Sequence, residues 1–250
     1  MKTKRRKSGF GLRAAELLLA AVFLFSAGKI GYTLFQYHKG EAGYEAIRNQ
    51  VAPSQAPKSA LTEETALVDF DALQRQYPQA VGWLYCEETE IDYPVMQADD
   101  NDYYLRRLPD GQWNLGGSLF LDYRSASDFS GELSLIYGHN MNDGSMFACL
   151  ENYREQSWYD EHPVFLMETE RGTSSLQVLY GFSIPAQEWT DRGFEKAENR
   201  EQLIDYAAAH TTFSSAVQRD ENAPLVALLT CTSSNNQNRY VLICQMTDSI

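Results

Sequence analysis

Near its C-terminus the chain reads Pro224-Leu225-Val226-Ala227-Leu228-Leu229-Thr230-Cys231, then a polar loop over 232–238, then Arg239-Tyr240-Val241-Leu242-Ile243. Two apolar runs joined by a polar loop predict a β-hairpin. Paired as neighbouring strands, Cys231 and Arg239 would lie about 5 Å apart at the backbone. A cation at that position favours a thiolate and can stabilise a negative carbonyl oxygen. The alternative is a buried structural thiol beside an ordinary surface charge.

Strand patterns dominate the globular part of the chain. Short apolar runs predict eight strands, at 80–85, 91–96, 118–121, 133–137, 164–168, 176–184, 225–230 and 240–246. Three helices are predicted among them, at 70–77, 145–154 and 199–209, the first ended by Pro78 and the last capped by Asn199. Many short strands with few helices favour a closed or nearly closed β-barrel over an alternating βαβ fold.

A histidine follows one of the predicted strands. The run over 133–137 turns out at Gly138-His139-Asn140, so His139 lies at a strand end, where catalytic groups collect on a rigid scaffold. Beside a cysteine, an imidazole can move the protons that acyl transfer requires. The alternative is a loop histidine that only makes a hydrogen bond. His38, His162 and His210 are weaker candidates because they lie beside the N-terminal apolar stretch, in a turn before a proline and at a helix end.

The chain has four cysteines, Cys86, Cys149, Cys231 and Cys244. Four cysteines in 250 residues are too few for a disulfide framework, and no pair has the spacing of zinc ligands. Cys149 shares a predicted helix face with apolar residues, and Cys86 and Cys244 lie at or in predicted strands. We therefore expect these three thiols to pack as small hydrophobic side chains, and we expect no metal or cofactor.

Charge is distributed unevenly. Residues 1–39 hold eight of the 21 basic residues and one of the 34 acidic ones, which leaves 13 basic and 33 acidic residues and a net charge of −20 for the rest. A body of that charge repels phosphate backbones, so nucleic acid is excluded as a partner.

The N-terminus predicts a membrane anchor. Basic residues precede a mostly apolar stretch over 17–35, whose single cation, Lys29, can extend its ammonium group to the membrane surface. We predict a basic cytoplasmic tail at 1–15, a transmembrane anchor at 16–36, a helical stalk and linker at 37–66 broken by Pro53 and Pro57, and a globular domain at 67–250. The positive-inside rule then places the domain outside the cell membrane, on a single span. A cleaved signal peptide is the alternative.

Several segments resemble class B sortases. Tyr137-Gly138-His139-Asn140-Met141, with Asp143-Gly144-Ser145-Met146-Phe147, is similar to the family's histidine segment. Leu228-Leu229-Thr230-Cys231, with Arg239-Tyr240-Val241, resembles its cysteine–arginine hairpin. Residues 83–84, 91–95, 100–105 and 117–122 match the family's first strand pair and the segments after it. The resemblance covers about residues 68–250, in order along the chain.

The resemblance implies a mainly β fold, a sortase-type closed eight-stranded β-barrel, and a cysteine transpeptidase of Gram-positive bacteria. In that role Cys231 attacks the carbonyl of a threonine in a C-terminal sorting signal, Arg239 stabilises the oxyanion and His139 protonates the departing amine. The implied partners are surface proteins or pilins that carry a sorting signal, and an amine of a peptidoglycan precursor or a pilin lysine as acceptor. No cofactor is implied.

The same resemblance names candidate substrate-binding residues: Thr230, Leu229, Tyr137, Ile184, Tyr206 and Ser214. Leu229 departs from the family, which usually has serine or threonine there, so the preferred sorting signal is open. The segment 183–216 resembles a loop with a helix that covers the substrate groove. Two other functions stay open at this point: a thiol hydrolase that releases surface proteins, and a membrane-tethered binding domain without catalysis.

Overall fold

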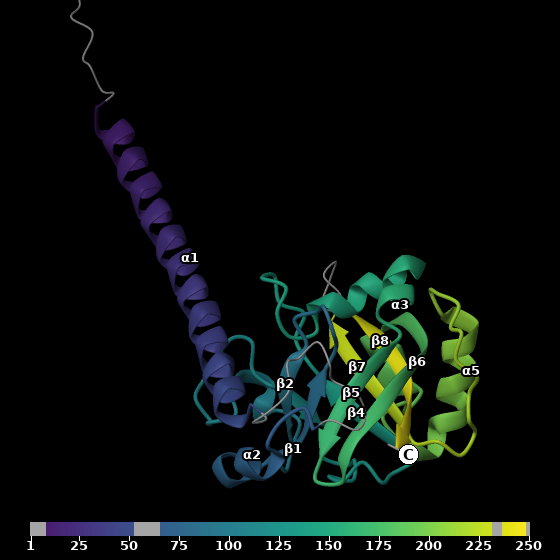
Figure 1. Cartoon of the computed structure of the whole chain (residues 1–250). Helices are drawn as coiled ribbons and strands as arrows, with labels where there is room; N and C mark the ends of the chain where they lie inside the picture. The colour runs from purple at the N-terminus through teal and green to yellow at the C-terminus, as the bar shows by residue number, and fades with distance from the viewer. Residues whose placement is uncertain (1–8, 53–65, 232–236, 249–250) are drawn as a thin grey trace, which may run out of the picture.

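A computed structural model describes residues 9–52, 66–231 and 237–248. A long helix, α1 (Gly9–Val51), projects from a barrel that carries short helices on its outside (Figure 1). The linker predicted after residue 52 lies outside the described residues, apart from its two ends.

The barrel closes in the strand order β1-β2-β3-β4-β7-β8-β6-β5. Its strands are β1 (Ala80–Tyr85), β2 (Asp92–Met96), β3 (Leu119–Leu121), β4 (Leu133–Tyr137), β5 (Val164–Thr169), β6 (Gly172–Pro185), β7 (Leu225–Cys231) and β8 (Asn238–Asp248). The β2–β3 and β4–β7 pairs are parallel, and the other six are antiparallel. The predicted closed eight-stranded barrel is therefore confirmed.

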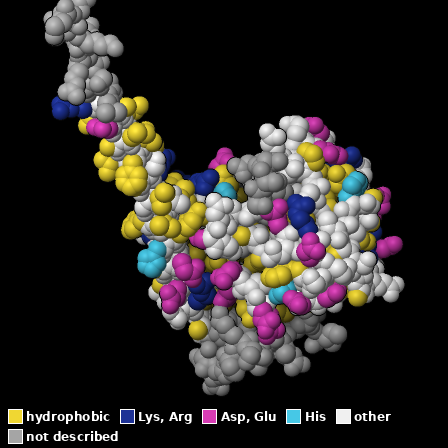
Figure 2. All heavy atoms as spheres, turned by 90° about the horizontal axis from the view of Figure 1, so that it is seen from above, with side chains coloured by type: hydrophobic (Ala, Val, Ile, Leu, Met, Phe, Trp, Pro, Cys, Tyr) yellow, Lys and Arg dark blue, Asp and Glu magenta, His cyan; other side chains and the backbone are white. Residues whose placement is uncertain are grey.

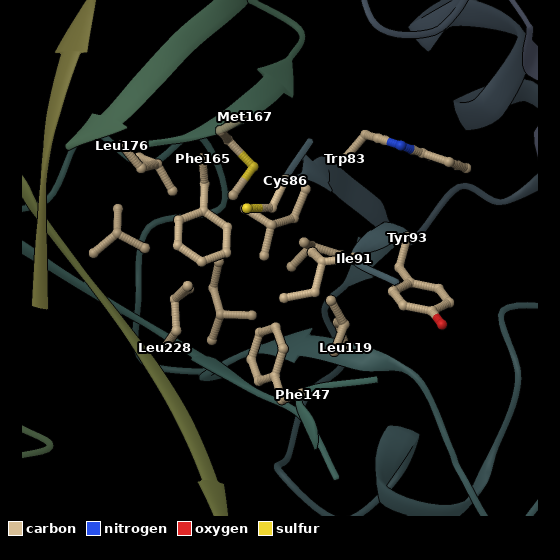
Figure 3. Packing of buried hydrophobic residues seen from close by; sticks show 14 of the residues in the cluster. Trp83, Cys86, Ile91, Tyr93, Leu119, Phe147, Phe165, Met167, Leu176 and Leu228 are labelled. Carbon is tan, nitrogen blue, oxygen red and sulfur yellow. The ribbon is translucent and has the colours of Figure 1, made fainter. Parts of the chain in front are cut away.

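A large cluster of buried apolar side chains fills the barrel interior and extends to the segments packed on its outside. Its members labelled in Figure 3 are Trp83, Cys86, Ile91, Tyr93, Leu119, Phe147, Phe165, Met167, Leu176 and Leu228. Cys86 and Cys244 are buried in this core, as predicted, and Cys149 packs against its edge. Burial raises the pKa of the Cys86 and Cys149 thiols to about 12 and raises that of Cys244 further. These thiols stay protonated at neutral pH, so they are poor nucleophiles.

A second apolar cluster lies outside the barrel, against β6, β7 and β8. It is covered by α4 (Ala186–Asp191) and α5 (Arg200–His210), which contribute Trp189, Leu203, Ile204 and Ala207. Between them a short 3-10 helix, η4 (Ala197–Asn199), joins the two helices. This cluster fixes the segment after β6 on the barrel wall.

Two helix predictions need correction. The helix expected at 145–154 is a 3-10 helix, η3 (Ala148–Arg154), followed by a short α-helix, α3 (Gln156–Glu161). Residues 145–147 are not helical. Met146 has a positive φ of 58°, and the Phe147 N–H donates to the His139 carbonyl at 2.9 Å. Asn199 precedes α5 as expected, but its amide donates to the carbonyls of Arg192 and Gly193 instead of capping the helix.

The last part of α1 packs on the barrel. Tyr44, Ile47 and Val51 belong to the same buried cluster as the barrel interior, and the Tyr44 hydroxyl donates to the Gly117 carbonyl at 2.6 Å. The chain resumes at Ala66 and forms α2 (Phe70–Gln76), where the N–H of Asp69 donates to the Val51 carbonyl at 2.8 Å. By length and composition α1 is the one helix among the described residues that could cross a membrane.

Candidate active site

The antiparallel pairing of β7 and β8 sets the backbone of Cys231 against that of Arg239. Cys231 is the last residue of β7, and its register partner in β8 is Arg239. The predicted hairpin is thus confirmed, with directly opposite Cα atoms about 5 Å apart. The side chain of Cys231 and residues 232–236 lie outside the described part of the structure, so the backbone register is what places this residue.

The parallel pairing of β4 and β7 carries His139 to the same end of the barrel. Tyr137 pairs with Leu229, and the Gly138 N–H donates to the Leu229 carbonyl at 3.1 Å. His139 and Cys231 each follow two residues after the Tyr137–Leu229 pair. Only glycine fits at 138, since a Cβ there would lie 2.5 Å from Leu119 Cδ2 and 2.6 Å from Phe147 Cδ2.

The His139 ring is held by a segment far away in sequence. Its Nε2 lies 2.8 Å from the carbonyl oxygen of Leu105, in the 3-10 helix η2 (Tyr104–Arg106). A carbonyl only accepts, so Nε2 carries the proton and Nδ1 is the acceptor of the neutral ring. Burial lowers the pKa of His139 and the Arg106 charge lowers it further, against the hydrogen bond to Leu105. The ring is therefore mainly neutral at pH 7.

A groove of about 340 Å³ opens beside these residues. It is lined by Asn101, Leu105, Phe120, Arg124, Tyr137, Ala186, Trp189, Thr190, Glu195, Leu229 and Arg239. Apolar and aromatic side chains are mixed with two cations, one carboxylate and one amide, which suits an extended peptide with both apolar and polar side chains.

One wall of the groove rests on a buried carboxylate. Asp122 accepts hydrogen bonds from the guanidinium of Arg124 at 2.7 and 2.8 Å, from the Asn101 amide at 2.9 Å and from the Tyr137 hydroxyl at 3.2 Å. Burial alone would raise the pKa of Asp122, but the hydrogen bonds from Arg124 and Asn101 outweigh it and lower the pKa. Asp122 stays charged and fixes three groove residues at once.

Arg239 and Glu195 give the groove charges of opposite sign. Arg239 is half-buried, and its Nη1 lies 3.4 Å from the Asn238 carbonyl oxygen. The Oε1 atom of Glu195 lies 3.9 Å from Nη1 of Arg124. The other carboxylate oxygen of Glu195 is buried and makes no hydrogen bond. Arg239 lines the groove and is the register partner of Cys231, so its backbone lies opposite that of Cys231 at the groove wall.

The structure brings two of the six candidate substrate-binding residues, Tyr137 and Leu229, to the groove. Thr230 points into the barrel, buried, and its hydroxyl makes no hydrogen bond. Ile184 is buried in the second cluster, Tyr206 packs between Phe194 and His210, and Ser214 is exposed beside another hollow. These four residues do not line the groove.

The groove residues that the sequence did not indicate come mostly from α4, η2 and the segment after β3. The segment 183–216 does flank the groove, but through Ala186, Trp189, Thr190 and Glu195 rather than through α5. Trp189 carried a signal, because a tryptophan in a segment expected to cover a groove is a natural lining residue. Arg124, two residues after Asp122, carried none.

The comparisons with known proteins agree with this fold. No protein-family model matches the sequence. Sortase B of Listeria monocytogenes is 29% identical over 242 residues, which cover 93% of this chain and 94% of that protein. A solved structure of sortase B from Listeria monocytogenes is 30% identical, with a TM-score of 0.60, and covers 69% of this chain and 97% of its own. The Staphylococcus aureus sortase B–substrate complex has a TM-score of 0.73 at 23% identity, covering 86% and 100%. This chain belongs to the class B sortases and is a cysteine transpeptidase.

Proposed function

We propose that Cys231 is the nucleophile, His139 the acid and base, and Arg239 the oxyanion stabiliser of a membrane-anchored transpeptidase that cleaves a sorting signal after threonine. The observation that carries this assignment is the strand register. Alternate residues of a strand share a face, so position 231 is on the face of Leu229 and of its partner Arg239, both of which line the groove.

The first half-reaction forms a thioester. The sulfur of Cys231 attacks the carbonyl carbon of the substrate threonine, and its proton passes to the neutral His139 ring. His139 then gives this proton to the amine of the next residue as the peptide bond breaks. During the attack the carbonyl oxygen becomes negative, and the planar guanidinium of Arg239 supplies donors for it.

The second half-reaction reverses the proton path. An amine attacks the thioester carbonyl, loses a proton to His139, and leaves an amide while the Cys231 thiol is restored. We propose an amine of a peptidoglycan precursor or a pilin lysine as acceptor. The net charge of −20 beyond residue 39 favours the approach of an ammonium group in general, although not at one point of the surface.

The groove is the proposed binding site for the sorting signal of a surface protein or pilin. Tyr137, Leu229 and Trp189 supply apolar surface, and Asn101 and Thr190 supply hydrogen-bonding groups along it. A relative with the same fold has been solved as a substrate complex, which supports a peptide site in this barrel.

The proposed organisation keeps the chain on the membrane. We assign 1–15 to a cytoplasmic tail, 16–36 to a single span, 37–66 to the connection and 67–250 to the extracellular catalytic domain. The apolar, exposed part of α1 supports the span, and the basic residues that precede it favour the inward orientation of the tail.

The test is to give the full chain, in detergent or lipid nanodiscs, a threonine-containing sorting peptide with and without an amine acceptor. The proposal predicts that the amine increases turnover and is found in the product, and that Cys231→Ala abolishes both effects. Brisk release of the peptide by water, with no amine incorporated from wall peptides or pilin lysines, would make the chain a hydrolase in practice and refute the proposed transfer.

A further inference from the structure

α1 changes its surroundings along its length. From Leu17 to Phe35 its large apolar side chains are exposed, and they cover the free part of the helix on the face seen in Figure 2. From Gln36 onward one side of the helix is buried against the barrel: the Asn114 amide donates to the Gln36 carbonyl at 2.8 Å. The first barrel contact is earlier still, where the Tyr32 ring stacks on Trp113 with centroids 6.4 Å apart.

The length of the exposed part matches a bilayer. From Glu16 to Gln36 the helix rises about 30 Å at about 1.5 Å per residue, and the hydrocarbon core of a bilayer is about 30 Å thick. If Glu16 lies at the inner surface, Gln36 lies at the outer one, and Tyr32 lies about one helical turn inside it. The barrel therefore begins to contact α1 at the depth where the span ends, with no spacer between them.

The attachment of α1 to the barrel is firm over the turns that follow. Gly40 allows the close approach, because a Cβ there would lie 3.2 Å from the Asn114 side chain. Tyr44 is buried with its hydroxyl on Gly117, and Arg48 donates to the Asp92 carbonyl at 3.3 Å. A single helix that is inserted in the membrane and fixed to the barrel also fixes the orientation of the barrel.

The barrel end that carries the groove points the same way as α1. In Figure 1, β7 ends and β8 begins on the side of the barrel toward which α1 projects. Trp113, whose ring stacks on Tyr32 of α1, is 46% exposed. The exposed Arg106 lies in the neighbouring segment: its guanidinium donates to the Leu115 carbonyl, and its backbone carbonyl accepts from the Asn114 N–H. Tryptophan and tyrosine at the end of a span, with an arginine nearby, are the side chains that favour the headgroup layer.

We propose that Tyr32, Trp113 and Arg106 form a lipid-headgroup contact that holds the groove toward the outer surface of the bilayer. This inference rests on the proposed membrane anchor and adds the contact surface and its partner. It also links the membrane to the active site, because Arg106 directly follows Leu105, whose carbonyl binds His139. A lipid-linked amine acceptor would then meet the groove without leaving the membrane surface.

The experiment uses tryptophan fluorescence of the full chain in lipid nanodiscs. The quenchers are a lipid with a nitroxide on its headgroup, a lipid brominated deep in its acyl chains, and aqueous iodide. The contribution of Trp113 is the difference between the wild type and Trp113→Phe. Adding Phe25→Trp to Trp113→Phe reports independently whether the helix spans the bilayer.

The proposal predicts that the headgroup nitroxide removes most of the Trp113 emission, while the deep bromines and iodide remove little. The deep bromines should quench the Phe25→Trp variant. If the deep bromines quench that variant but iodide alone quenches Trp113, the headgroup contact is refuted and the membrane anchor is not. If iodide quenches the emission added by Phe25→Trp, the membrane anchor and the headgroup contact are both refuted.

A second variant tests the consequence for catalysis. Trp113 does not line the groove, so Trp113→Asp should cleave a soluble sorting peptide at the wild-type rate. With an amine-headgroup lipid as acceptor in the nanodisc, Trp113→Asp should lose transfer severalfold, whereas Trp113→Phe should keep it. Equal losses with the soluble peptide, or no loss with the lipid acceptor, would refute the role of this contact.

Discussion

The attachment of α1 predicts that Tyr44→Ala destabilises the catalytic barrel, although Tyr44 lies outside the barrel in sequence. The Tyr44 side chain is buried, its ring meets Tyr93 edge-on with centroids 5.0 Å apart, and its hydroxyl bonds Gly117 and Ser118. Loss of a large buried aromatic side chain, together with a buried hydrogen bond, costs about 4 kcal/mol in unfolding free energy. Tyr44→Phe removes the hydrogen bonds alone and should cost about 1–2 kcal/mol.

The assay is guanidinium unfolding of the full chain in detergent micelles, followed by near-ultraviolet circular dichroism. Phe35→Ala is the matched control on the same helix, because Phe35 is 61% exposed and should change the unfolding free energy little in micelles. Tyr44→Ala should also lower kcat, because Gly117 lies under the η2 segment, whose Leu105 carbonyl binds His139. An unfolding free energy within about 1 kcal/mol of the wild type would refute the claim that α1 completes the core.

Three further predictions concern the active site. Arg239→Lys keeps the charge but loses the planar fork of donors, so kcat/KM should fall by about 10²–10³ with an unchanged circular dichroism spectrum; near-normal turnover would contradict the oxyanion role. Burial lowers the pKa of His139, and the neutral ring is the base, so kcat/KM should rise with pH through a midpoint below 6.5 and stay level above it. A midpoint above 7 would contradict the assignment. Iodoacetamide at pH 7.5 should label Cys231 before Cys86, Cys149 or Cys244, since burial raises the pKa of the latter three thiols; peptide mapping with first labelling at Cys149 would count against this order.

The strands could be predicted well because their signal is local. Alternating or continuous apolar runs mark each strand by itself, and the pairing of Cys231 with Arg239 follows from the length of two such runs and the loop between them. The burial of Cys86 and Cys244 follows from the same runs. The number and short spacing of the strands already favoured a closed or nearly closed barrel, and the family resemblance then implied a closed sortase-type barrel of eight strands.

The groove could be predicted only in part because packing between distant segments builds it. Asn101, Arg124 and Tyr137 meet because all three bond Asp122, and nothing in their spacing indicates that buried carboxylate. Tyr206 was expected there from its segment, yet the second apolar cluster turns α5 away from the groove.

The packing of α1 was also hidden from the sequence. Its buried face includes Gln36 and Gly40, which do not read as a core-facing stripe. Asn114 lies over both residues: its amide donates to the Gln36 backbone carbonyl, and its side chain would be 3.2 Å from a Cβ at position 40, so only the partner segment explains this face.

The most direct test of the central claim is the intact mass of the full chain after a brief reaction with a threonine-containing sorting peptide, followed by mapping of the modified residue. The account predicts a mass increase equal to the acyl fragment that ends in threonine, on Cys231 alone, sensitive to hydroxylamine and absent from Cys231→Ala. It also predicts that an added amine discharges this adduct. A peptide cleaved at the wild-type rate by Cys231→Ala, or an adduct mapped to Cys149, would contradict the assignment of Cys231 as the nucleophile.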